Sequence, residues 1–256
     1  MQWNQNTYIP TYGNAWTASN DSCHTLKGTD STVFPPNAQE GEGMYVYNTD
    51  ICRTVKLAFK SSNVDFSGIK AFRYEAEDTF LRTTSLIPEH DCFCTKSTKD
   101  ASGQDNCYLD GALDFKPCLG APALITQPHF LNADESYLDG VTGLNPDKEK
   151  HGMYLLLEPN TGTPLAGMKR IQINTVLRSQ PLLNMTTPTT MHNGIVPVLW
   201  LEEGFSLPQE YVDELNDQYF KTVKIATGLK YALIALCSAL FIACIYLVWR
   251  KEYFKK

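Results

Sequence analysis

The stretch YALIALCSALFIACIYLVW occupies residues 231–249 and contains no charged side chain. A bilayer's hydrocarbon core of about 30 Å requires roughly 20 apolar residues in a helix, so a helix of this length can cross it. The buried helix of a soluble domain is the alternative, but such a helix carries a polar stripe that this stretch lacks. We therefore predict a transmembrane helix over residues 225–249.

The charges that flank this span give its orientation. The tail RKEYFKK, residues 250–256, holds four bases and one acid and follows the span directly. Basic residues favour the cytoplasmic side, so we expect a short basic cytoplasmic tail. Three lysines before the span, Lys221, Lys224 and Lys230, weaken this signal. The long segment before the span must therefore decide the orientation.

Cysteines and glycosylation sequons favour an exported segment. Six of the eight cysteines lie within residues 23–118, namely Cys23, Cys52, Cys92, Cys94, Cys107 and Cys118. An even set outside the membrane indicates disulfides formed in an oxidising compartment. Sequons stand at Asn20 and Asn184, and such sites accept sugar only on the exported side. We expect residues 1–220 to lie outside the cytoplasm, with a disulfide-rich part at 23–118.

The N-terminus does not explain this export. Residues 1–16, MQWNQNTYIPTYGNAW, have neither a basic start nor an apolar run of the kind found in signal sequences. We therefore expect the chain to be a fragment or a truncated isoform whose missing part carries a signal or a first span. Before Tyr219 the chain holds 15 basic and 27 acidic residues, which excludes an electrostatic surface for nucleic acid.

The exported segment has the pattern of a β-rich domain. Residues 170–177 alternate, with Ile171 and Ile173 on one face and Gln172 and Asn174 on the other. Short apolar runs separated by turn residues recur at 44–47, 55–59, 123–126, 153–157 and 195–201. Such runs are typical of an antiparallel sheet or barrel. A capping box at Ser206 to Gln209 and a proline in the first turn predict a helix just before the membrane.

No catalytic constellation or cofactor motif is present in the sequence. Ser67 to Lys70 matches Ser-x-x-Lys but lacks the companion motifs of that enzyme class. The cysteines around His90 have ligand types that suit zinc, but a paired Cys-x-x-Cys is absent, and export favours disulfides. His129 is read as a hydrogen-bonded core residue. The acidic pairs at 134–135 and 202–203 are read as solvated, with weak calcium binding as the alternative. We expect no enzyme, no metal site and no cofactor.

Several ordered motifs resemble those of the class B scavenger receptors. They are Gly28-Thr29-Asp30, Phe34-Pro35-Pro36, Asp50-Ile51-Cys52-Arg53, Cys92-Phe93-Cys94, Pro128-His129-Phe130-Leu131, Gly143-Leu144-Asn145-Pro146, Glu158-Pro159-Asn160-Thr161-Gly162 and the runs at 169–174 and 195–200. The similarity extends from about Tyr8 to the C-terminus, and the stretches from 143 and 158 are most similar to insect members. Fatty acid translocase, lysosomal integral membrane protein and the insect sensory neuron membrane proteins belong to this family.

The resemblance implies a mainly β fold with some helix. The ectodomain of such a receptor is an irregular antiparallel β-barrel with a lipid tunnel, and this chain would hold the C-terminal part of it together with one transmembrane helix. The resemblance also implies the pairs Cys23–Cys92, Cys52–Cys118 and Cys94–Cys107. One departure is Ser31, where many members have glycine, so a turn that requires positive φ would be strained there.

The function that follows from the resemblance is binding and transfer of hydrophobic ligands at the cell surface, such as fatty acids, lipoprotein lipids or carotenoids. The alternative is a receptor that recognises apoptotic cells, microbes or a partner receptor through its surface. A homo-oligomer is compatible with either function. The tail has no dileucine or tyrosine sorting signal, so we expect the plasma membrane rather than the lysosome or endosome.

Overall fold

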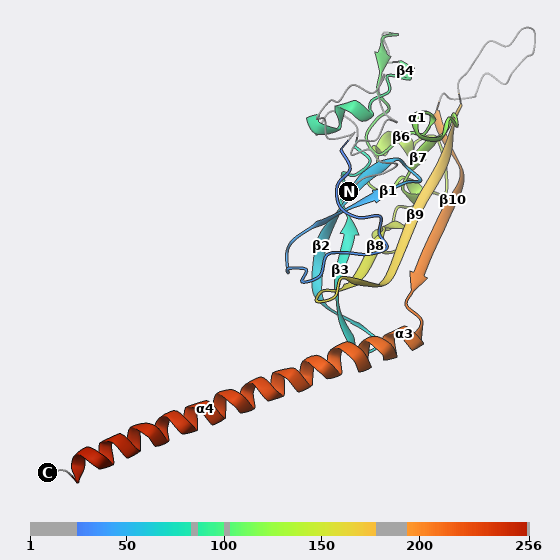
Figure 1. Ribbon diagram of the computed structural model, residues 1–256. Helices are drawn as coiled ribbons and strands as arrows, with labels where there is room; N and C mark the ends of the chain where they lie inside the picture. Colours follow the sequence, from blue (N-terminus) through green and yellow to red (C-terminus); the bar gives the residue numbers. More distant parts are fainter. Residues whose placement is uncertain (1–24, 83–86, 100–102, 178–193, 255–256) are drawn as a thin grey trace, which may run out of the picture. The chain divides into compact units, whose positions relative to one another are not determined.

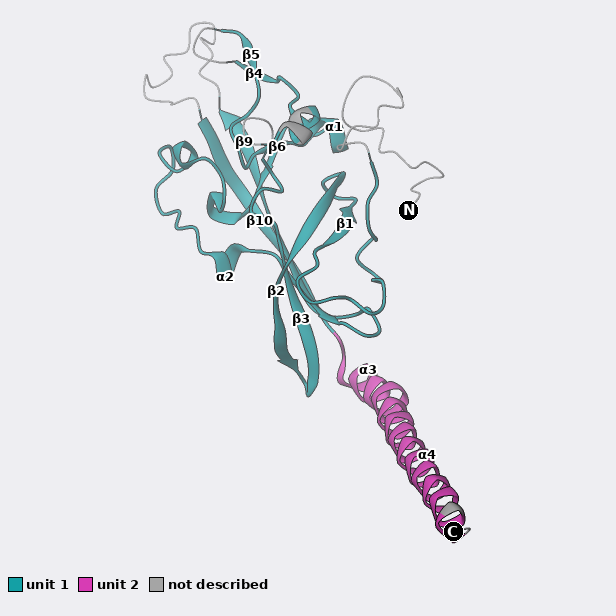
Figure 2. Ribbon diagram, turned by 90° about the vertical axis from the view of Figure 1, so that its left-hand side faces the viewer, with its two compact units in different colours: residues 1–206 teal, residues 207–256 magenta. Residues whose placement is uncertain are grey.

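The computed structural model describes residues 25–82, 87–99, 103–177 and 194–254 (Figure 1). The chain divides into two compact units, Met1–Ser206 and Leu207–Lys256, coloured separately in Figure 2. The predicted sugar sites Asn20 and Asn184 and the cysteine Cys23 lie outside the described residues.

The first unit is built on one antiparallel sheet. Its hydrogen-bonded order is β1-β2-β3-β8-β9-β7-β6, and β10 pairs with the other edge of β9. The strands are β1 (Met44–Asn48), β2 (Arg53–Phe66), β3 (Ile69–Ala76), β6 (Leu113–Asp114), β7 (Leu124–Thr126), β8 (Tyr154–Glu158), β9 (Thr163–Leu177) and β10 (Gly194–Ser206). Strands β4 (Thr98–Lys99) and β5 (Asp105–Asn106) form a separate ribbon. The predicted antiparallel sheet is confirmed, and within the described residues it stays open, because β1 and β10 do not pair.

The five apolar runs of the sequence all fall in strands, in β1, β2, β7, β8 and β10. Short helices connect them: η1 (Pro88–Phe93), α1 (Lys116–Leu119), η2 (Pro128–Phe130), η3 (Glu135–Tyr137) and α2 (Lys148–His151). The hairpin between β2 and β3 turns at Ser67 and Gly68, both with positive φ (50° and 84°), which is the backbone of a tight two-residue hairpin turn. The Ser-x-x-Lys match at Ser67 therefore lies at a hairpin turn.

The turn between β8 and β9 explains the Glu158 to Gly162 motif. The carboxylate of Glu158 is buried and accepts hydrogen bonds from the backbone N–H groups of Asn160 (3.1 Å) and Thr161 (2.6 Å). Gly162 has φ of 74°, and a Cβ there would lie 2.2 Å from the carbonyl oxygen of Phe34. Glycine is therefore required at this position by both its conformation and the close approach of residue 34.

The second unit is helical. It contains α3 (Gln209–Glu214), a π-helical turn (Leu215–Phe220) and α4 (Lys221–Tyr253). The helix from Gln209 to Lys251 is long and apolar enough to cross a membrane, and its apolar window is fully exposed. The predicted helix before the span is confirmed, but the prediction that a capping box begins it at Ser206 is wrong. Strand β10 continues to Ser206, and Pro208 occupies the N-cap without a side-chain cap.

Candidate functional site

The sheet of the first unit lines a partly open cavity of about 290 Å³. Six strands of one sheet contribute to its wall, from β1, β2 and β3 through β8 and β9 to β10. Most of the wall is apolar, including Phe34, Val46, Val55, Leu57, Leu155 and Phe205. Since side chains alternate between the two faces of a strand, Val55 and Leu57 of β2 line it together. This apolar cavity is the candidate site.

Two glycines make room for neighbouring side chains, one on each face of the sheet: Gly167 shares the cavity face with Phe205, and Gly204 shares the opposite face with Met168. Gly167 in β9 pairs with Phe205 in β10, and a Cβ on Gly167 would lie 2.6 Å from Cε1 of the Phe205 ring. A Cβ on Gly204 would lie 2.7 Å from the terminal methyl of Met168. Any larger residue at these two positions would displace Phe205 or Met168. The glycines therefore determine how the strands pack beside the cavity.

One charged cluster borders the cavity. The ammonium group of Lys169 in β9 lies 2.5 Å from a carboxylate oxygen of Asp50 and 2.5 Å from one of Glu203 in β10. Burial alone would lower the pKa of Lys169, but the hydrogen bonds that it donates to Asp50 and Glu203 outweigh burial and raise the pKa above its usual 10.5. Lys169 is therefore protonated at neutral pH and provides a fixed positive charge at the wall.

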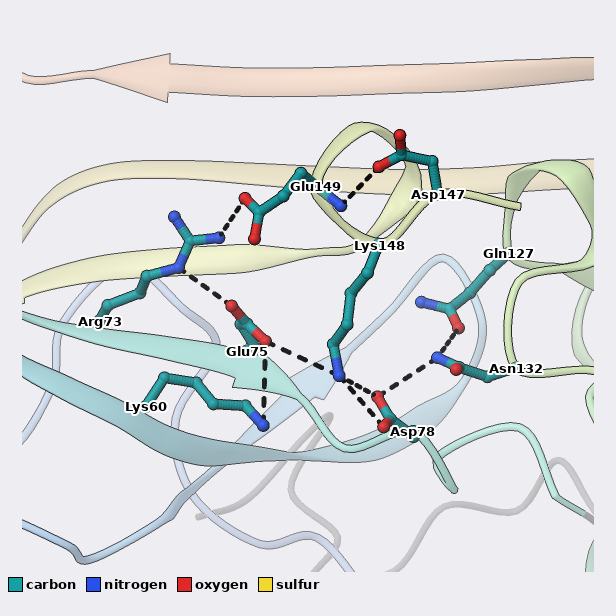
Figure 3. Close-up of polar contacts among 9 residues, drawn as sticks. All are labelled: Lys60, Arg73, Glu75, Asp78, Gln127, Asn132, Asp147, Lys148 and Glu149. Atoms are coloured by element: carbon teal, nitrogen blue, oxygen red, sulfur yellow. Dashed lines mark hydrogen bonds and ion pairs between the residues drawn. The ribbon is translucent and has the colours of Figure 1, made fainter. Parts of the chain in front are cut away.

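A second polar network lies on β3 and α2, and Figure 3 shows its side chains converging. Glu75 accepts from Arg73 (3.0 Å) and lies 4.0 Å from Lys148, which also binds Asp78 at 2.9 Å. Arg73 reaches Glu149 on α2 at 3.3 Å. Acids and bases alternate, so the network joins α2 to the sheet by paired charges. Among the described residues no group of three or more His, Cys, Asp or Glu side chains could hold a metal.

The remaining acidic pairs are engaged in local contacts. Glu202 binds Arg170 (2.6 Å) and Glu203 binds Lys169, and their side chains are 44% and 74% exposed, so this pair is solvated as expected and also forms ion pairs. Asp134 accepts from the backbone N–H of Ser136 at the start of η3. Asp134 also accepts from the hydroxyl group of Ser136 (2.6 Å). The hydroxyl bond, followed by the backbone bond, lowers the pKa of Asp134, and burial opposes both.

His129 has two kinds of contact. Its Nδ1 accepts a hydrogen bond from the backbone N–H of Asn145 (3.0 Å), and its ring stacks on His151 with centroids 4.2 Å apart. The backbone N–H of His129 donates to the side chain of Gln172 at 2.9 Å. The residue is only partly buried. These contacts position η2 and α2 over the sheet.

The described cysteines of the first unit are all disulfide-bonded. The structure joins Cys52 to Cys118, with Cα atoms 5.7 Å apart, and Cys94 to Cys107, with Cα atoms 5.1 Å apart. Cys92 is also disulfide-bonded; its expected partner, Cys23, is outside the described part of the chain. Cys237 and Cys244 in α4 are free and exposed. Ser31 has φ of 72°, the positive value that glycine adopts without strain.

A disulfide-bonded antiparallel sheet with an apolar cavity, followed by one long apolar helix, defines a membrane-anchored protein. The chain belongs to the CD36 family, whose model matches residues 1–248. It is therefore a class B scavenger receptor-like membrane protein.

Curated relatives support the same family. The chain is 33% identical over 251 residues to sensory neuron membrane protein 2 of Anopheles gambiae, covering 97% of this chain and 43% of that protein. It is 34% identical over 233 residues to the protein of the same name from Drosophila melanogaster, covering 90% and 41%. Sensory neuron membrane protein 1 of Pediculus humanus subsp. corporis is 33% identical over 211 residues, covering 82% and 38%. The chain thus spans less than half the length of these three relatives.

Proposed function

We propose that the chain binds the hydrocarbon part of a lipid in the cavity of its sheet, as part of a receptor that takes up or transfers hydrophobic ligands. The observation that supports this proposal is the apolar wall, with Leu57, Leu155 and Phe205 facing one volume of about 290 Å³. Each methylene transferred from water into such a wall contributes about 0.8 kcal/mol, so about ten methylenes would contribute about 8 kcal/mol before the cost of ordering the ligand. The role is binding and passage rather than turnover.

The free edge of the sheet supports a further part of this proposal, that the chain is the C-terminal portion of a longer receptor. In β10 the side chains of Val198, Leu199, Trp200 and Leu201 are 44–61% exposed. Four consecutive apolar residues place apolar groups on both faces of a strand, a pattern typical of strands covered on both sides. An additional strand beside β10 would cover them and satisfy the open edge.

We further propose that residues 1–220 face the outside of the cell, that residues 225–249 form the span, and that the short tail lies in the cytoplasm. The relatives are named sensory neuron membrane proteins, which supports the plasma membrane as the site of action. The sugar sites Asn20 and Asn184 belong to this proposal, as does the pairing of Cys23 with Cys92.

Photolabelling tests the cavity. The whole chain, reconstituted in lipid nanodiscs, would be labelled with a long-chain alkyl diazirine, and the labelled peptides would be mapped by mass spectrometry. We expect label on peptides from β2 and β9. The variant Leu57→Trp fills the wall from the cavity face of β2 and should lose this label, whereas Val198→Trp adds the same ring on an exposed β10 position outside the cavity wall and should keep it. Equal labelling of both variants would contradict the proposal.

A further inference from the structure

The charged cluster at the cavity is formed by three separate segments. Asp50 belongs to the β1–β2 connection, Lys169 to β9 and Glu203 to β10. Lys169 and Glu203 are the only charged residues among those that line the cavity in the described part of the chain. The Lys169 side chain is 29% exposed. A ligand whose hydrocarbon lies along the apolar wall therefore places its polar end near this cluster.

The ammonium group of Lys169 does not use all of its hydrogen-bond donors within the cluster. An ammonium group has three N–H donors, and the two carboxylates use two of them. No third acceptor for Lys169 is present among the described residues. One donor is thus left for a ligand oxygen.

The charge of the cluster is unbalanced. One ammonium group and two carboxylates carry a net charge of about −1. A ligand carboxylate would bring a third negative charge to a single positive one. The Asp50 and Glu203 side chains are 52% and 74% exposed, so water screens part of that repulsion, and the apolar wall beside Lys169 screens it less than water does. A neutral oxygen, such as that of a hydroxyl, aldehyde or ester, can accept the third N–H without adding charge.

We propose that Asp50, Lys169 and Glu203 select the headgroup of the ligand, so that the cavity takes a neutral oxygen-bearing amphiphile in preference to a fatty-acid carboxylate. This inference rests on the proposed function and specifies the chemical class of its ligand. Lys169 supplies the hydrogen bond, and the two carboxylates reject an anion. The selectivity comes from an unpaired donor and an unfavourable charge rather than from the shape of the wall.

Competition against the diazirine probe tests the proposed preference for a neutral headgroup. The whole chain in nanodiscs, at about pH 8, would be challenged with three competitors of equal chain length: tetradecanol, methyl tetradecanoate and tetradecanoate. We expect the alcohol and the ester to compete at about tenfold lower concentration than the carboxylate, which corresponds to a modest charge repulsion at a partly exposed site. Equal competition by all three would overturn the inference while leaving the lipid cavity in place.

Two variants distinguish the effect of the cluster on competition from a general effect of protein charge. They also control for unequal partition of the competitors into the bilayer. Glu203→Gln and Asp50→Asn each remove one negative charge, and each should improve competition by tetradecanoate about tenfold relative to tetradecanol. Glu202→Gln makes the same change on the same strand, but Glu202 binds Arg170 and does not line the cavity. In Glu202→Gln the ratio of the tetradecanoate and tetradecanol concentrations needed for competition should equal that of the unmodified chain. Identical ratios in Glu203→Gln and Glu202→Gln would refute the headgroup role, and failure of all three competitors would refute the cavity itself.

Discussion

Replacement of Asn174 by alanine should destabilise the first unit more than any surface change of similar size. Asn174 is fully buried in β9. Its amide group donates to the carbonyl oxygen of Leu124 (3.1 Å) and to Oγ1 of Thr126 (3.1 Å), and its side-chain oxygen accepts from Gln172 (2.9 Å). The amide also donates to the carbonyl oxygen of Gln172 (3.2 Å). Alanine removes all four contacts and leaves buried polar groups on β7 and β9 short of a partner.

The expected loss follows from these contacts. Each lost hydrogen bond contributes about 1 kcal/mol, and a buried polar group without its partner costs about 1–3 kcal/mol. The Gln172 side chain keeps two bonds, to Thr126 at 3.2 Å and from the backbone N–H of His129 at 2.9 Å, so the penalty is partial. We expect the free energy of unfolding to fall by about 3 kcal/mol, a large share of the roughly 5–15 kcal/mol typical of a domain.

Urea unfolding of the whole chain in mild detergent, followed by pulse proteolysis, measures this loss. The matched control is Asn63→Ala, since Asn63 is an exposed asparagine in strand β2. Its effect should stay within about 0.5 kcal/mol. A change of less than about 0.5 kcal/mol for Asn174→Ala would refute the view that this polar face stabilises the sheet.

Three further predictions concern acid, the disulfides and one turn. Burial, followed by the charge of His129, lowers the pKa of His151 from 6.5, so the folded state favours the neutral ring. The urea midpoint of unfolding should therefore drop as the pH falls below about 6.5, and it should drop less in the variant His151→Gln. Replacing both Cys94 and Cys107 by alanine should cost about 3 kcal/mol, because their disulfide closes a loop with a sequence separation of 13; an unchanged urea midpoint would contradict this. Ser31→Gly should stabilise the chain by about 0.5–1 kcal/mol, since φ there is 72°; a lower midpoint would show that Ser31 is not strained.

Most strands could be predicted because each is a short apolar run between turn residues. Strand β3 was missed, since Lys70, Arg73 and Glu75 interrupt its apolar pattern. In the structure Arg73 and Glu75 bind one another and the charged residues of α2. A local pattern does not show such neutralisation, because the partners come from distant parts of the chain.

The alternation in β9 was predicted correctly, but the environment of its polar face was not evident. Gln172 and Asn174 are 2% and 0% exposed, because β7 and η2 cover them and supply their hydrogen bonds. Alternation shows which side chains share a face, whereas burial of that face depends on segments about 45 residues away.

The candidate site was the least predictable part. The cavity depends on the register that places Gly167 opposite Phe205, and the contact between Lys169 and Asp50 joins residues 119 positions apart. Neither Gly167 nor Lys169 stands out from the residues around it in the sequence. Only the arrangement of six strands brings the apolar wall and the charged cluster together.

Lipid extraction from the purified whole chain, analysed by mass spectrometry, tests the central claim most directly. We expect apolar lipid to co-purify at about one molecule per chain, as expected for one preformed apolar pocket. The lipid should be lost from Leu57→Trp and retained by Val198→Trp. A chain that carries no lipid, or equal amounts of lipid in the two variants, would contradict the account of the cavity as a lipid site.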